Sequence, residues 1–104
     1  MDNRFQGNID QIKTLRVRRA DTGEELALKG RLAWCAATLI DAGERGFTSV
    51  ERPAPRTSDY IFQLRGKGLP IITEDEKHSG PYAGTHGRYK LQASLQVIDV
   101  EYAQ

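Results

Sequence analysis

The feature that most constrains the fold of this chain is a helix pattern that leads directly into two strand patterns. Residues 57–67 have the spacing of a short helix, which Gly66 can end. Ile71 and Ile72 then predict a strand, and residues 88–91 predict its return partner. The segment between the strands is polar, rich in glycine and too long for a tight hairpin. We therefore expect a helix joined to a long-looped hairpin in the second half of the chain.

The rest of the chain has four further local patterns. Residues 12–28 predict a hairpin, because apolar and polar residues alternate on either side of a turn at 20–23. Residues 30–42 predict a helix with one buried apolar stripe, and residues 47–51 predict a brief second helix. Residues 95–102 predict a final strand of high β-propensity. With the later helix, these patterns predict an α+β fold that contains three helices.

Short polar side chains are placed to begin the two later helices. Thr48 or Ser49 could cap the brief helix, which Pro53 keeps short. Thr57 or Ser58 could cap the third helix in the same way.

Length and composition place these patterns in one domain. The chain has 104 residues, of which 38% are hydrophobic and 28% are charged. We divide it into an N-terminal tail at 1–11, a folded domain at 12–92 and a C-terminal extension at 93–104. No apolar run approaches the roughly 20 residues of a membrane-spanning helix, and the start lacks the apolar core of a signal peptide. The single cysteine, Cys35, cannot form an internal disulfide, so we expect a cytoplasmic location.

Trp34 lies nearly opposite Leu32 on the 30–42 helix, away from its main apolar stripe. So large an apolar side chain is rarely left bare, and we expect a second cover on that face. The hairpin at 12–28 or the C-terminal segment is the favoured cover, and a partner chain is the alternative. An unpaired apolar edge on the strand at 95–102 would also invite a second copy, which predicts a weak homodimer.

Four stretches resemble, in order, parts of the winged helix-turn-helix superfamily of DNA-binding proteins. They are RVRRADTGEE, GRLAWCAATLIDAGERGFTS, RPAPRTSDYIFQLRGKGLPI and GPYAGTHGRYKL, and the resemblance covers roughly residues 15–91. More narrowly, the chain is similar to small winged-helix-domain proteins of alphaproteobacterial, often rhizobial, genomes. The resemblance implies a winged helix-turn-helix of three helices plus a wing hairpin. It also implies that 57–67 is the recognition helix and 73–88 the wing.

The expected recognition helix turns Asp59, Phe62, Gln63 and Gly66 away from its core residue Ile61. On that outer side Gln63 could pair with adenine, Arg56 with guanine, and Lys67 with phosphate. Asp59 could accept a hydrogen bond from a cytosine amino group, or it could simply be a residue of the helix start. Tyr60 could support the core or reach a phosphate. The alternative is a polar-faced helix that only covers the core. The candidate DNA contacts here are Arg56, Ser58, Asp59, Tyr60, Gln63 and Lys67.

The expected wing combines basic and polar side chains with glycines that allow close backbone approach to phosphate. The alternative is a mobile surface loop without a ligand. The two histidines lack further metal-ligating neighbours at suitable spacing, so we expect no metal. The candidate DNA contacts in the wing are Lys77, His78, Thr85, His86 and Arg88.

No catalytic or cofactor-binding motif stands out, so we expect a binding protein and not an enzyme, with no cofactor. The net charge of +1 argues only weakly for DNA binding, but the basic residues concentrate at 1–19 and 52–98. The predicted function is double-stranded DNA binding by a nucleoid-associated transcriptional regulator or mobile-element accessory factor. The alternative is a winged helix that docks on another protein without binding DNA.

Overall fold

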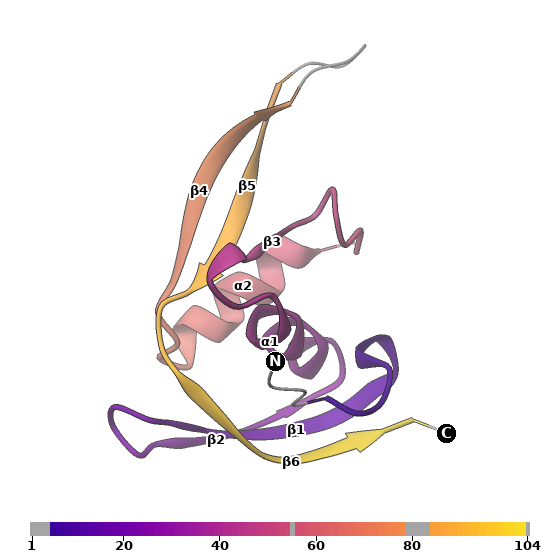
Figure 1. Cartoon of the computed structure of the whole chain (residues 1–104), viewed down its shortest axis with the longest axis vertical. Coiled ribbons are helices and arrows are strands. Elements are labelled where there is room, and N and C mark those ends of the chain that lie inside the picture. The colour runs from indigo at the N-terminus through magenta and orange to yellow at the C-terminus, as the bar shows by residue number, and fades with distance from the viewer. Residues whose placement is uncertain (1–4, 55, 79–83, 104) are drawn as a thin grey trace.

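The computed structural model describes residues 5–54, 56–78 and 84–103, which form two helices and two three-stranded sheets (Figure 1). The helix α1 (Gly30–Ala42) lies at the centre and contacts the first sheet, the second helix and strand β5 (Gly84–Leu91). The hairpin of β4 (Ile71–His78) and β5 extends away from this centre (Figure 1), and the chain spans 43 × 33 × 28 Å.

The first sheet is antiparallel and has the order β2-β1-β6. It consists of β1 (Ile12–Arg19), β2 (Glu25–Lys29) and β6 (Leu95–Tyr102). Leu15 and Val17 of β1 are fully buried, as the alternating pattern requires. The predicted hairpin and the predicted last strand are both confirmed. Because β6 pairs with β1, the two ends of the chain share one sheet.

The helix α1 confirms the predicted helix at 30–42, and all residues from 33 to 40 are buried. It ends where Gly43 takes a φ of 62°, a conformation that glycine adopts without steric cost. Burial raises the pKa of the Cys35 thiol to about 12, so the thiol stays protonated near neutral pH and is a poor nucleophile.

Trp34 is only 3% exposed, and residues of the same chain cover it. Its indole nitrogen donates to the Asp10 carboxylate at 2.9 Å, in the short helix η1 (Ile9–Gln11). The Arg31 guanidinium lies 4.3 Å above its ring, and Phe47 meets it edge-on at 6.2 Å between ring centroids. A second cover therefore exists, and these contacts come from η1, α1 and Phe47; the favoured sources, the hairpin at 12–28 and the C-terminal segment, supply none of them. No partner chain is needed to shield this tryptophan.

The predicted helix at 47–51 is wrong. After the short helix η2 (Gly43–Arg45), Phe47 and Thr48 form strand β3, which pairs with β5. A single turn follows, in which the Thr48 hydroxyl accepts from the Glu51 amide at 3.0 Å and the Glu51 carboxylate accepts from the Thr48 amide at 3.3 Å. This is a reciprocal capping box. The capping signal was real, but Pro53 stops the turn from continuing into a helix. The described residues thus contain two α-helices and not three.

The second sheet has the order β3-β5-β4 and contains β4 (Ile71–His78) and β5 (Gly84–Leu91). Their ladder runs without interruption from Ile71 opposite Leu91 to His78 opposite Gly84. The resemblance implied a wing at 73–88, and the described residues of that range form a regular ladder, so the strands are longer than the sequence predicted. Residues 79–83 lie outside the described residues.

Candidate nucleic-acid interface

The helix α2 (Thr57–Gly66) buries one face and exposes the other. Thr57, Ile61 and Leu64 are buried. The exposed residues of the helix and its C-terminal neighbour are Ser58, Phe62, Gln63, Arg65, Gly66 and Lys67. The predicted orientation around Ile61 is therefore confirmed.

The start of α2 differs from the prediction. Neither Thr57 nor Ser58 is the N-cap, because the Thr57 hydroxyl donates to the Ala54 carbonyl at 2.8 Å. Arg56 occupies the N-cap position with φ 68° and ψ 23°, a left-handed conformation that is strained for a residue with a side chain. Its carbonyl accepts from the amides of Asp59 and Tyr60. This backbone conformation sets the direction in which the Arg56 side chain leaves the main chain.

Three of the predicted contact residues form one hydrogen-bonded row along the exposed face. A single Asp59 carboxylate oxygen accepts from the Arg56 guanidinium at 3.0 Å and from the Gln63 side-chain amide at 3.0 Å. Of the two alternatives for Asp59, these contacts favour a role within the start of the helix, where its carboxylate binds neighbouring side chains. A ligand that binds Arg56 or Gln63 must compete with this carboxylate or bind alongside it.

The other helix candidates have different surroundings. Tyr60 is half-buried and packs against the core, which favours a supporting role. Ser58 and Lys67 are exposed at opposite ends of the helix.

Arg65 joins α2 to the hairpin. Its guanidinium donates to the Ile71 carbonyl and to the Thr73 hydroxyl, both at 2.8 Å. The helix and the first strand of the hairpin are therefore tied directly, and the turn between them is short (Figure 1). A ligand that contacts both α2 and the hairpin therefore binds two elements whose relative position is already fixed.

Arg88 lies at the base of the hairpin and is committed to carboxylates. Its side chain is 14% exposed and binds Glu76 of β4 and, at 3.1 Å, Glu51 of the turn after β3. The Arg88 guanidinium holds the pKa of both glutamates below the usual range. This arrangement ties β5 to β4 and β3, so we expect Arg88 to support the hairpin, and its contact with phosphate stays an untested prediction.

The remaining hairpin candidates lie on different faces of the β4–β5 hairpin. His86 is half-buried, and its ring nitrogen lies 3.2 Å from the Glu76 carboxylate. Lys77 and Thr85 are exposed and directly opposite each other in the ladder. Alternate residues of a strand share a face, so Lys77 lies on the same face of β4 as Thr73, which Arg65 of α2 holds. His78 is placed only by its backbone, opposite Gly84.

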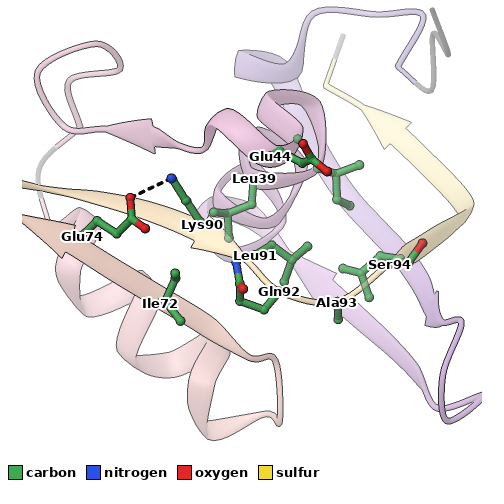
Figure 2. A pocket seen from close by; sticks show the side chains of 12 residues that line it. Leu39, Glu44, Ile72, Glu74, Lys90, Leu91, Gln92, Ala93 and Ser94 are labelled. Carbon is green, nitrogen blue, oxygen red and sulfur yellow. Dashed lines mark ion pairs between the residues drawn. The ribbon is translucent and has the colours of Figure 1, made fainter.

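A hollow of about 730 Å³ lies on another part of the surface, at the end of α1 beside β4 and the link from β5 to β6 (Figure 2). An ion pair of 2.7 Å between Glu74 and Lys90 crosses one side of it, and Leu39 and Ile72 contribute apolar surface (Figure 2). None of the predicted contact residues lines this hollow.

The sequence did not identify two of the features that shape this interface. Phe62 was placed on the exposed face of α2 but not among the contacts, and the structure leaves it 73% exposed. Glu51 was treated as part of a helix, whereas it is a partner of Arg88. An exposed aromatic next to Gln63 was a visible signal for the first, but no local pattern indicated the second.

Within the described ranges, no cluster of three or more histidine, cysteine, aspartate or glutamate side chains is arranged to hold a metal ion. No helix in the described part of the chain is long and apolar enough to cross a membrane.

Comparison with known families gives a match over most of the chain. Residues 25–101 match a family model described as a winged helix domain. The match includes both helices, the β4–β5 hairpin and most of β6. Neither curated proteins nor solved structures gave a significant match.

Proposed function

The chain belongs to the winged helix domain family, and from that premise we propose that it binds double-stranded DNA. In this proposal α2 enters the major groove, and the β4–β5 hairpin follows the DNA backbone as the wing. The role is that of a binding protein without catalysis. The resemblance to alphaproteobacterial winged-helix proteins supports a bacterial, nucleoid-associated regulator or an accessory factor of a mobile element.

One observation carries the proposal: the exposed face of α2 is polar and is fixed to a projecting hairpin. Gln63 offers an amide of the kind that pairs with adenine, and Arg56 and Lys67 place cations at the two ends of the helix. The Arg65 contacts to β4 hold the hairpin at a set position beside this helix. A fixed pair of elements allows one to contact the DNA backbone and set the register while the other reads base edges.

The wing contribution rests on Lys77 and Thr85 in this proposal. Both are exposed, and Lys77 shares a strand face with Thr73, next to α2. His78 and His86 remain weaker candidates, since His86 lies against Glu76. Phosphate contacts of this kind position the protein without reading sequence.

Selection of bound fragments from random duplexes, followed by titration at several salt concentrations, tests the proposal. DNA binding should weaken steeply as salt rises, because bound cations release counterions from the duplex. Gln63→Ala should cost about 1–3 kcal/mol at the selected site and little on scrambled duplexes. Lys77→Ala should weaken binding to all duplexes and lower the salt slope by about one.

Docking on another protein is the competing function, and the same titrations separate the two. A chain that binds no duplex at low salt, or one whose binding ignores salt, would contradict the DNA proposal.

A further inference from the structure

Phe62 is the most exposed of the large hydrophobic side chains among the described residues, with 73% of its surface accessible. It lies in the middle of α2, between Asp59 and Gln63 in sequence. Its helix neighbours four positions away, Ser58 and Gly66, are small, and those three positions away are the charged residues Asp59 and Arg65. A Cβ built on Gly66 would meet no atom within 4 Å outside the backbone of the helix, so the surface at Gly66 is open.

This ring does not belong to an apolar patch. The other exposed large hydrophobics in the described residues are Val50 and Ile72, which lie on the turn after β3 and on β4. Ile72 points to the opposite face of β4 from Thr73, the residue that α2 contacts through Arg65. A protein-docking interface needs a cluster of buried anchors, and an isolated ring on a polar face does not supply one.

A single apolar side chain beside a base-pairing amide suits one chemical group in the major groove. The C5-methyl of a pyrimidine is the apolar group exposed there, and thymine presents it beside the N6 and N7 atoms of its paired adenine. Gln63 is the adjacent residue and has the amide that pairs with those adenine atoms. The two side chains therefore match the two halves of one adenine–thymine pair or of two neighbouring pairs.

We propose that Phe62 is a specificity-determining residue that contacts a pyrimidine C5-methyl group, normally that of thymine, in the major groove. The inference rests on the proposed function, since it assumes that α2 enters that groove. It adds an apolar contact with the thymine methyl group, which the hydrogen bonds of Gln63, Arg56 and Lys67 do not make.

The test begins with the duplex that selection from random sequences gives. Each thymine is replaced singly by deoxyuridine, which removes only the methyl group, and binding is measured for the unaltered chain, Phe62→Ala and Val50→Ala. At one or two positions we expect the unaltered chain to lose about fourfold in affinity, as for one buried methyl group. Phe62→Ala should bind the thymine and deoxyuridine duplexes equally. Val50→Ala removes an exposed apolar side chain outside α2 and should keep the full difference.

A second arm distinguishes the source of the methyl group. Cytosines of the selected site are replaced singly by 5-methylcytosine, which presents the same C5-methyl group. A gain in affinity that Phe62→Ala abolishes would assign the contact to methylated cytosine and still support methyl recognition by this ring.

Other outcomes overturn the inference and separate it from the proposed function. Sequence-preferring, salt-dependent binding with no methyl sensitivity, or with sensitivity that survives in Phe62→Ala, would remove Phe62 from the reading surface while DNA binding stands. A change in sedimentation caused by Phe62→Ala would place the ring in a contact between copies and would also overturn it. Absence of duplex binding would overturn both proposals together.

Discussion

The Asp59 carboxylate accepts hydrogen bonds from two residues that the sequence assigned to DNA contacts, Arg56 and Gln63. Both donors are exposed, so these bonds form in competition with water and each contributes little to stability. They also bear on binding, because a phosphate that approaches Arg56 meets the negative charge of the same carboxylate. At the scale of the residue, we therefore expect Asp59 to limit non-specific attraction to DNA.

Asp59→Asn should raise affinity for duplex DNA, including scrambled sequences. The substitution keeps the side-chain shape but removes the negative charge beside Arg56, and an exposed ion pair of this kind corresponds to at most about fivefold in affinity. Titration of both proteins at low and moderate salt measures the effect. Asp41→Asn is the matched control, since it removes an exposed charge from α1, outside the proposed interface. Equal affinities for Asp59→Asn and the unaltered chain would show that Asp59 does not restrain Arg56.

At the scale of the element, local patterns predicted the hairpin of β1 and β2, the helices α1 and α2, and the strand β6. They failed where distant partners decide the outcome. Phe47 and Thr48 have a helix-start signal, but pairing with Tyr89 and Arg88 makes them a strand. The Arg88 contact to Glu51 joins residues 37 positions apart, which no local pattern indicates.

Gly46 and Gly43 offer a matched pair for testing how β3 is placed. Both have positive φ, 68° and 62°, so alanine is strained at either site. Only at Gly46 would the new Cβ collide with the carbonyl oxygen of Tyr89 on β5, whereas Gly43 has open space. Gly46→Ala should therefore reduce the free energy of unfolding by about 1–3 kcal/mol more than Gly43→Ala does. Urea denaturation measures both, and equal losses would mean that β3 can move away from β5 at little cost.

The contacts of Arg88 with Glu51 and Glu76 predict how the stability of the protein depends on pH. Glu51 and Glu76 have folded-state pKa values below their ordinary 4.5, chiefly through hydrogen bonds from Arg88. Their contribution is therefore present above pH 4.5 and is lost as the pH falls below it. Thermal unfolding near pH 6 and near pH 3 should show a larger acid-induced loss for the unaltered chain than for Arg88→Gln. Lys90→Gln removes a cation from the same strand without touching these two glutamates and should retain the acid sensitivity.

At the scale of the whole molecule, the chain closes its core without a partner but leaves sheet edges open. Trp34 is covered from within, so one of the two reasons for expecting a homodimer no longer applies. The other reason persists, because β6 is an edge strand of the first sheet. Its edge is blunted by Asp99 and Glu101 and by a bulge at Ile98, the residue skipped where the register shifts. Such an edge favours weak association of two copies and opposes the continued addition of further chains to the sheet.

We therefore predict a homodimer that forms through β6 only at high protein concentration, with the two copies related by a twofold axis. Paired copies on paired half-sites would also increase the specificity of so small a domain. The sedimentation coefficient should rise with concentration for the unaltered chain and stay at the monomer value for Ile98→Lys, which adds a charge to the edge.

Truncation at Gln92 is a poor test, because it removes buried Leu95 and a whole strand of the first sheet. Phe62→Ala serves as the control, since it alters an exposed residue far along the chain from β6 and should associate as the unaltered chain does. A constant monomer value for the unaltered chain at the highest concentration would rule out the dimer, and specificity would then rest on the contacts of a single α2 and its hairpin.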